Sequence, residues 1–599
     1  MNHKIPVLFL SAIVLMFASA CNDGIKVWVE PSTERVMMNT PAGSDSQAFI
    51  YAARNEYESF QVVVRGGLKG LKDVNVAATD LTGPGDAFIP KENITMFREY
   101  YVKVNSPSFL GGVVGNLRLP GNYPDPLIPF FDPYDSGHPA VGAPFDITRL
   151  KNQPVWIDVY VPEETPAGSY TGKLEITAAG KNPVYIDLNL TVWDFSIPRE
   201  RTIATSYGLL PGSVPQYHPQ ALTAEAKNNY EQELHRHRID SFSTAGMLEY
   251  PFVFGSDGHL LPVDWSNYDA VMGPRLDGSF YNDGVPLYRF NAGFFYPGGT
   301  GWMETSLTDE QYKEAAKEFA RHLKEKGWMD RVYMYVLDEP FINAKSYDVV
   351  ANDIKLILEA DPDWKGAFLV TNWWVKDLED TIDIWCPEVT KYDDWFLGAI
   401  GVKFAGREQY AKMLADGREL WFYVCLATVP PYPGYDIDTM IGYEPRILMW
   451  GSWYEGATGF LYWSTMYWVK DDPWGKLKDP VTFPVSSRNG DGFLFYPGDH
   501  NGTLSPAGSP HGISINGPIT SIRLKQTRDG LEDWEMFKMA SSAAGVDAVK
   551  ACVSRAYTQM GTAPVLGLYN PLSPPWTYDG KVLNEVRKEV AGMIINNHP

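Results

Sequence analysis

RVYMYVLDEP, residues 331–340, is the stretch from which the fold of the chain can be read. Every position from 332 to 337 carries an apolar or aromatic side chain, which is typical of a parallel strand covered on both faces. Two adjacent carboxylates, Asp338 and Glu339, end this strand, and Pro340 closes it. Because unpaired carboxylates are costly to desolvate, their position at the end of a hydrophobic strand indicates a functional site.

Seven further stretches have strand character, and most of them are separated by helical segments. The clearest helix runs from 308 to 326, where Thr308 with Gln311 predicts a capping box and Gly327 predicts the end. Eight strands that alternate with helices predict a (β/α)8 barrel, with the active site at the carboxyl ends of the strands. The candidate strands are 203–208, 240–246, 289–297, 331–337, 366–372, 381–387, 420–426 and 459–465.

The residues before the barrel predict a second domain. From 24 to about 198 the sequence lacks helical periodicity and contains short alternating runs between turn residues, which indicates an N-terminal β-sandwich. We therefore expect a sandwich domain at 22–198 and a barrel domain at 199–599 that ends in C-terminal closing helices. The proline-rich stretch 105–154 is expected to be a long irregular loop.

Length and charge limit what the protein can do. A chain of 599 residues is expected to form two or three domains. The net charge of −22, without any basic cluster, argues against a nucleic-acid partner. The aromatic content of 14% suits a protein whose sites bind sugar rings, although most aromatic side chains are expected in the core.

The N-terminus resembles a bacterial lipoprotein signal. Lys4 precedes a long apolar run, and the small residues Ser19 and Ala20 come directly before Cys21. We expect residues 1–21 to be the signal region, with Cys21 acylated, so that the protein is anchored in the bacterial envelope and meets the membrane only through this lipid. The three other cysteines are expected to be buried free thiols.

Several side chains are placed near the predicted barrel mouth. Trp373 and Trp463 are candidates for stacking against a sugar, and Asn372 is a candidate for binding a hydroxyl group. Tyr207 also lies at the end of a predicted strand. The remaining candidates are Tyr392 or Tyr432 for an acetamido oxygen and Asp393 for hydroxyls or for Glu339.

His235 and His237 are two positions apart on a helical stretch. Side chains with that spacing point to different helix faces, so we expect surface residues and not a metal pair. No metal site, phosphate loop or dinucleotide motif is indicated, and we expect neither a metal nor another cofactor.

Adjacent carboxylates suit one version of glycoside hydrolysis. Cleavage needs a general acid beside the leaving oxygen and a second group that stabilises or captures the cation-like sugar. Consecutive residues fit a substrate-assisted reaction, in which the 2-acetamido oxygen of the sugar attacks while a carboxylate orients the amide. Glu339 would be the acid/base with a raised pKa, and Asp338 would stay ionised as the acetamido partner. A structural alternative pairs each carboxylate with an arginine such as Arg331 or Arg446.

Five segments together resemble glycoside hydrolase family 123. This resemblance implies a β-sandwich followed by a (β/α)8 barrel, β-N-acetylgalactosaminidase activity, and substrate-assisted retention by an adjacent Asp-Glu pair. The pair corresponds to Asp338 and Glu339. The five segments are NEYESFQVVV (55–64), YVLDEP (335–340), WGSWYEGATGFLYWS (450–464), GDGFLFYPG (490–498) and IRLKQTRDGLEDWE (522–535).

The leading hypothesis is a lipid-anchored, exo-acting β-N-acetylgalactosaminidase whose substrate is a glycan or glycolipid with terminal β-linked N-acetylgalactosamine. Two alternatives remain. A conventional retaining glycosidase would pair Glu339 with Asp393 or Asp394 and act on sugars without an acetamido group. A sugar-binding lipoprotein without catalytic activity would bind such glycans and leave them intact.

Overall fold

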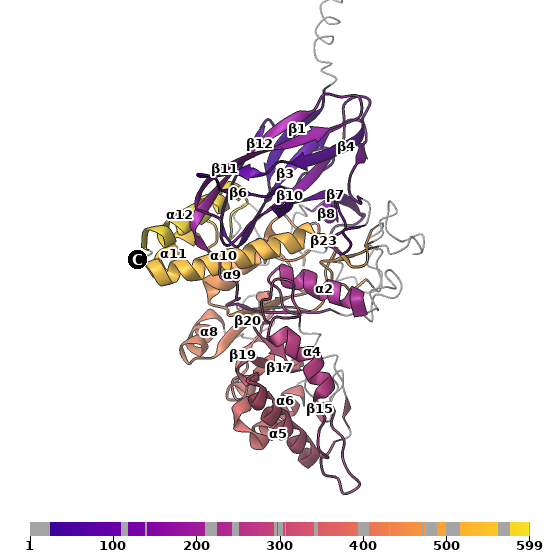
Figure 1. The fold of residues 1–599 in the computed structure, drawn as a ribbon. Helices are drawn as coiled ribbons and strands as arrows, with labels where there is room; N and C mark the ends of the chain where they lie inside the picture. The colour runs from indigo at the N-terminus through magenta and orange to yellow at the C-terminus, as the bar shows by residue number, and fades with distance from the viewer. Residues whose placement is uncertain are drawn as a thin grey trace, which may run out of the picture.

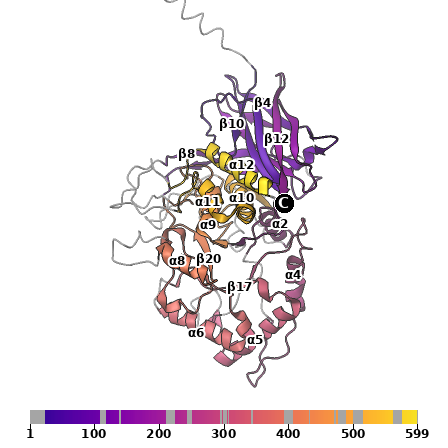
Figure 2. The same ribbon diagram turned by 90° about the vertical axis from the view of Figure 1, so that its left-hand side faces the viewer.

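Two parts of different architecture make up the described chain (Figures 1 and 2). The structure is a computed structural model, and its first part is β-rich while its second part contains a parallel sheet surrounded by helices. None of the helices within the described ranges is long and apolar enough to cross a membrane. The structure describes residues 24–108, 118–137, 140–209, 224–241, 251–292, 296–297, 304–305, 307–340, 345–392, 406–430, 432–468, 473–474, 488–498, 515–560 and 575–597.

The N-terminal part consists of two sheets that pack face to face on a shared apolar core, as in a β-sandwich. Buried and exposed side chains alternate along the strands, so that one face of each sheet is apolar. In β4 (Leu71–Ala78), for example, the buried residues Leu71, Val74 and Val76 are separated by exposed ones. The first sheet has the order β1 (Lys26–Pro31), β3 (Glu56–Arg65), β10 (Asn152–Val161), β7 (Ile94–Val104), β8 (Gly121–Pro129), β23 (Pro518–Ser521) and β22 (Tyr496–Pro497). The second has the order β2 (Gln47–Arg54), β12 (Val184–Ser196), β11 (Gly168–Thr177), β4 (Leu71–Ala78) and β9 (Phe145–Ile147), with β5 (Leu81–Thr82) and β6 (Phe88–Ile89) beside it.

The expected irregular loop at 105–154 is wrong in part, because β8 and β9 lie within it. Strand β8 pairs with β7 although it contains Pro124, Pro126 and Pro129. Proline cannot donate a ladder hydrogen bond, so it is tolerated where a strand has an irregular register or a short neighbour. Both conditions hold here, since the β7–β8 register shifts between Glu99 and Tyr101 and β23 pairs with β8 only briefly.

The second part contains a nearly closed barrel of parallel strands. Its sheet order is β13, β21, β20, β19, β18, β17, β14, and an isolated parallel bridge joins Tyr207 to Ser241 beyond β13. The described residues thus form seven strands, and an eight-stranded barrel is not confirmed. The strands are β13 (Ala204–Tyr207), β14 (Phe290–Asn291), β17 (Val332–Leu337), β18 (Phe368–Val370), β19 (Ile384–Trp385), β20 (Glu419–Val424) and β21 (Gly459–Tyr462).

Helices connect most of these strands and lie outside them (Figure 2). In α5 the predicted capping box is present: the backbone N–H of Gln311 donates to the Thr308 hydroxyl, and Gly327 ends the helix with φ of 69°. The helices are α2 (Ala224–Arg236), α4 (Ser266–Leu276), α5 (Asp309–Lys326), α6 (Lys345–Ala360), α8 (Gly406–Ala415) and α9 (Glu444–Glu455).

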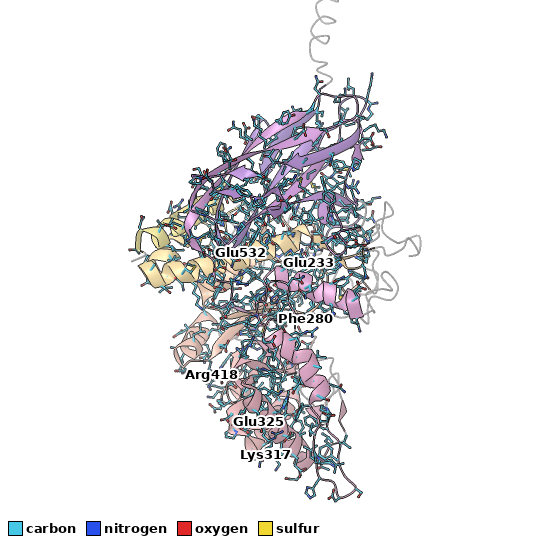
Figure 3. All side chains as sticks on the ribbon, viewed as in Figure 1. Glu233, Phe280, Lys317, Glu325, Arg418 and Glu532 are labelled. Atoms are coloured by element: carbon cyan, nitrogen blue, oxygen red, sulfur yellow. The ribbon has the colours of Figure 1, made fainter. Side chains whose placement is uncertain are left out.

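The C-terminal elements bind both parts of the molecule, whereas the sequence predicted only helices that close the barrel. Helices α10 (Ile522–Ala544), α11 (Val546–Val553) and α12 (Gly580–Asn597) follow the barrel, and α10 packs along α9. Strands β22 and β23 extend the first sandwich sheet. Glu532 on α10, labelled in Figure 3, accepts a hydrogen bond from the backbone N–H of Tyr57 in β3 at 3.2 Å.

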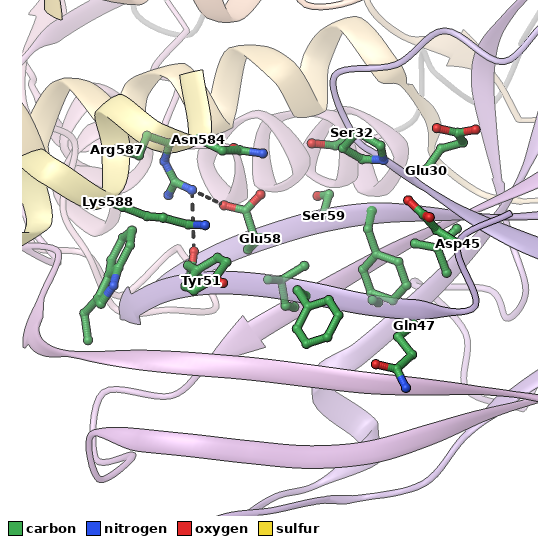
Figure 4. Close-up of a pocket in the computed structure, with 17 residues that line it drawn as sticks. Glu30, Ser32, Asp45, Gln47, Tyr51, Glu58, Ser59, Asn584, Arg587 and Lys588 are labelled. Carbon is green, nitrogen blue, oxygen red and sulfur yellow. Dashed lines mark hydrogen bonds and ion pairs between the residues drawn. The ribbon is translucent and has the colours of Figure 1, made fainter. Parts of the chain in front are cut away.

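A cavity of about 190 Å³ lies where β1, β2 and β3 meet α12 (Figure 4). Arg587 and Glu58 form an ion pair in its wall at 2.5 Å, and the Lys588 ammonium lies 3.7 Å from the centroid of the Tyr51 ring. These charged groups are already engaged with one another. The cavity is therefore part of the packing seam between the sandwich and α12.

The two histidines near the end of α2 are buried, so their predicted surface position is wrong. His235 stacks on Tyr281 at 3.4 Å between ring centroids, and Nδ1–H of His237 donates a hydrogen bond to the carbonyl oxygen of Glu233 at 2.7 Å. Burial lowers the pKa of His237 well below its usual value. Within the described ranges, no group of three or more His, Cys, Asp or Glu side chains could hold a metal ion.

Candidate active site

The carboxyl end of β17 departs from regular strand geometry just before the two carboxylates. The pairing of β17 with β18 shifts register between Tyr335 and Leu337, and Glu339 has a positive φ of 43°. A positive φ is strained for a side chain other than glycine, and such strain is common at functional sites. The irregular backbone changes the direction of the side chains that follow the strand. Asp338 and Glu339 therefore both reach hydroxyl groups inside the barrel.

One oxygen of Asp338 is held by two neighbouring hydroxyl groups. Tyr335 on β17 donates to Oδ1 at 2.7 Å, and Thr371, directly after β18, donates to the same atom at 3.0 Å. Asp338 is exposed, and no hydrogen bond from the described residues reaches its Oδ2. The Thr371 oxygen also accepts the backbone N–H of Glu339 at 2.9 Å, which fixes the two acids relative to each other.

Glu339 is held from the other side of the barrel. The hydroxyl of Tyr423 on β20 donates to Oε1 of Glu339 at 2.6 Å. Burial raises the pKa of Glu339, the bond from Tyr423 lowers it, and the nearby charges of Asp338 and Glu388 raise it further. The net shift is upward, so this carboxyl keeps its proton to a higher pH than an ordinary glutamate.

Neither acid forms an ion pair among the described residues, although the nearby charge of Lys391 lowers the pKa of Glu339. Arg331 donates instead to the carbonyl oxygens of Leu276 at 2.7 Å and Tyr288 at 3.4 Å. Arg446 binds Asp533 at 2.6 Å, away from the mouth. The structural alternative, in which these arginines neutralise the pair, is therefore wrong.

A third carboxylate lies at the end of β21. Oδ1 of Asp491 accepts hydrogen bonds from the Tyr462 hydroxyl at 3.2 Å and from Trp463 Nε1 at 3.4 Å. Trp463 is partly exposed and packs against Tyr467 with ring centroids 5.0 Å apart. This side of the mouth therefore combines an aromatic surface with an acid.

Two of the predicted sugar-binding tyrosines point away from the barrel interior. Ala204 belongs to the inner core, and side chains alternate along a strand, so Tyr207 faces the outer helices, where its hydroxyl binds that of Tyr435 at 2.7 Å. Tyr392 packs on Tyr410 of α8 and donates to Glu455 of α9 at 3.3 Å. Their burial argues against the predicted sugar contacts.

The other predicted residues differ in how far they reach the mouth. Trp373 is partly exposed, next to the buried Asn372, which donates to the Trp373 carbonyl at 2.6 Å. Tyr432 is buried, with 1% of its surface exposed. Asp393, with Asp394, and the lipidation candidate Cys21 lie outside the described residues.

Sequence reasoning missed four side chains that hold the carboxylates or line the mouth. These are Tyr335, Thr371, Tyr423 and Asp491. The alternation of inner and outer positions could have identified Tyr335 and Tyr423, because both belong to strands that the sequence did predict. Asp491 sits in the turn between two glycines that the family resemblance had already singled out.

Two family models match this chain. The catalytic domain of glycoside hydrolase 123 matches residues 300–540, and the glycoside hydrolase 123 N-terminal domain matches residues 39–178. No curated protein sequence matches. The first match covers β17, the catalytic candidates and the turn that carries Asp491.

One solved structure of similar length has the same overall fold. A family 123 glycoside hydrolase from Clostridium perfringens, described for glycolipid glycan hydrolysis, superimposes with a TM-score of 0.63 at 15% identity, covering 96% of this chain and 97% of that one. A family 39 glycoside hydrolase from Bacteroides cellulosilyticus WH2 is less similar. It superimposes with a TM-score of only 0.30 at 12% identity, covering 81% of this chain and 82% of that one. The chain therefore belongs to glycoside hydrolase family 123, and its barrel is the catalytic domain of a glycosidase.

Proposed function

We propose that the protein is a retaining exo-β-N-acetylgalactosaminidase that uses the 2-acetamido group of its substrate as the nucleophile. The observation that carries this proposal is the way the adjacent carboxylates are held. Oδ1 of Asp338 and Oε1 of Glu339 are each bound by barrel hydroxyls, while Oδ2 and Oε2 receive no hydrogen bond from the described residues. Two available carboxylate oxygens at one mouth suit two different tasks on one sugar.

In the first step Glu339 gives its proton to the leaving oxygen as the bond between C1 and that oxygen breaks. The acetamido carbonyl oxygen forms a new bond to C1, and the product is a cyclic oxazolinium. Asp338 accepts the hydrogen bond of the acetamido N–H and stabilises the positive charge that develops there. The raised pKa of Glu339 suits the acid in this step.

In the second step a water molecule opens the ring. The Glu339 carboxylate takes one proton from this water while the water oxygen bonds to C1, and the bond between C1 and the acetamido oxygen breaks. Each step inverts C1, so the released sugar keeps the β configuration. Glu339 ends protonated and ready for another cycle.

The proposed substrate is a glycan or glycolipid that ends in β-linked N-acetylgalactosamine. Support comes from the Clostridium perfringens enzyme of the same family, which is described for glycolipid glycans. We further propose that Cys21 carries a lipid anchor, which would hold the enzyme at the bacterial envelope. Replacing Cys21 with serine should release the protein into the soluble fraction, and continued membrane association would exclude the anchor.

The experiment is a comparison of aryl β-glycosides with and without the 2-acetamido group. The proposal predicts cleavage of aryl β-N-acetylgalactosaminide, β-configured initial product by NMR, and inhibition by a thiazoline that mimics the cyclic intermediate. Equal cleavage of aryl β-galactoside without thiazoline inhibition would instead indicate a conventional retaining glycosidase. Binding without turnover of any aryl glycoside would indicate a sugar-binding protein.

A further inference from the structure

Asp491 lies across the barrel mouth from the catalytic pair. Three strands, β18, β19 and β20, separate β17 from β21 in the sheet order, so the ends of β17 and β21 face each other. Asp338 and Glu339 follow β17, whereas Asp491 is bound at the end of β21 by Tyr462 and Trp463. A sugar whose acetamido group is held at β17 would therefore direct the opposite edge of its ring, with C4 and C6, towards Asp491.

The turn that carries Asp491 is packed tightly against Trp463. Gly490 and Gly492 have φ of 94° and 85°, a conformation that favours glycine. A Cβ on Gly492 would lie 2.3 Å from the Trp463 ring. The backbone N–H of Gly492 donates to the Tyr462 hydroxyl at 2.6 Å, and this hydroxyl in turn donates to Asp491. The acid and the indole ring are thus fixed as one unit.

The free oxygen of Asp491 is suited to accept hydroxyl groups. Both printed bonds reach Oδ1, and no hydrogen bond from the described residues reaches Oδ2. Asp491 forms no ion pair within the described ranges; the nearby Arg488 binds Asp436 at 2.9 Å. Burial raises the pKa of Asp491 to about 6, so the carboxylate is ionised at neutral pH and can accept hydrogen bonds from a sugar.

We propose that Asp491 and Trp463 determine which terminal sugar is cleaved: the indole packs under the ring, and Oδ2 of Asp491 accepts a hydrogen bond from the axial C4 hydroxyl of N-acetylgalactosamine. This inference rests on the proposed β-N-acetylgalactosaminidase activity. In N-acetylglucosamine the C4 hydroxyl is equatorial and points in another direction. The wrong epimer would leave a partly buried carboxylate without its partner, and a polar group left unpaired in this way discriminates strongly between substrates.

The test combines enzyme variants with altered substrates. Wild type and Asp491→Asn are assayed for kcat/KM on aryl β-N-acetylgalactosaminide, its 4-deoxy analogue and aryl β-N-acetylglucosaminide. Asp377→Asn is the matched control, because Asp377 is an exposed aspartate after β18 that forms no ion pair with any described residue. Asp491→Asn should lower kcat/KM about 10–100-fold on the parent sugar but less than about 3-fold on the 4-deoxy sugar. The preference for the galacto epimer should fall accordingly.

The outcomes separate this inference from the proposed function. An equal loss on the parent and the 4-deoxy sugar would overturn the role of Asp491 in reading C4, because a merely structural defect affects both substrates alike. If wild type cleaves neither acetamido sugar, the proposed function itself fails. Should Asp491→Asn not fold by circular dichroism, Trp463→Phe provides the same test, since it removes the N–H bond to Asp491 and keeps a ring. It should reduce epimer preference, and unchanged preference would contradict the proposal.

Discussion

The carboxylates in the seam between the two domains and those at the barrel mouth differ in the groups that hold them. In the seam, Arg587 of α12 binds Glu56, Glu58 and Asp533, and Arg446 of α9 binds the same Asp533 at 2.6 Å. At the mouth, tyrosine, threonine and tryptophan side chains hold the acids, and no arginine within the described ranges pairs with them. Acids paired with cations fix the fold, whereas acids held by neutral donors keep the freedom to exchange protons or bind hydroxyls.

The largest effect is expected from removing the acid at the mouth. Glu339→Gln should lower kcat on substrates with poor leaving groups about 10³–10⁴-fold, because the amide cannot donate a proton to the leaving oxygen. Aryl substrates with good leaving groups should lose much less. Steady-state kinetics on both substrate types checks this, and near-wild-type turnover of the poor substrate would exclude the assigned role.

In the seam, Arg587→Met should destabilise the protein by about 3–5 kcal/mol, because Glu56 and Glu58 lose the arginine that pairs with them within the described ranges and Asp533 keeps only Arg446. Chemical denaturation measures this loss. The matched control is Arg321→Met on α5, whose pairs with Glu318 and Glu325 are at the surface and should cost less than about 1 kcal/mol. Equal costs for the two variants would contradict the distinction between buried and exposed pairs.

Asp353 on α6 is a third kind of acid, because it is buried away from the mouth and forms no ion pair with an arginine among the described residues. Burial raises the pKa of its carboxyl to about 7. Between about pH 4 and pH 7 the folded state therefore keeps a proton that the unfolded state releases. The free energy of unfolding falls as the pH rises through this range. Asp353→Asn should remove that dependence and raise stability at pH 8 by on the order of 1–3 kcal/mol. Parallel stability curves for the variant and wild type would contradict this assignment.

The smallest effect concerns the donor that holds Glu339. The hydrogen bond from Tyr423 lowers the pKa of Glu339, so Tyr423→Phe should raise that pKa further. Because the acid must be protonated, the alkaline limb of the kcat/KM profile should move to higher pH by up to about one unit. Tyr335→Phe is the control, since Tyr335 binds Asp338. If the alkaline limb moved in Tyr335→Phe but not in Tyr423→Phe, Asp338 and not Glu339 would be the acid.

Local signals in the sequence predicted the two adjacent acids that we propose as the catalytic pair. A continuous apolar run ending in Asp338 and Glu339 is visible without any tertiary information, and the capping box at Thr308 likewise depends only on near neighbours. The register shift in β17 and the positive φ of Glu339 were not predictable, because no glycine marks the bend. These two features bring both acids to the same mouth.

Side chains that act across the barrel were harder to find. Tyr423 follows Glu339 by 84 positions, so its hydrogen bond depends on which strands lie opposite each other. Tyr207 was chosen for its place at a strand end, but the alternation of inner and outer positions turns it towards the helices. The prolines in β8 gave the opposite error, since they suggested a loop where β7 provides a strand partner.

The division of labour between the adjacent acids is tested most directly by the affinity of the thiazoline mimic, measured by calorimetry for wild type, Asp338→Asn and Glu339→Gln. Asp338→Asn should weaken binding about 100-fold, because it loses the charge that stabilises the cyclic amide, whereas Glu339→Gln should change it less than about 10-fold. Equal losses in the two variants, or a larger loss for Glu339→Gln, would contradict the account.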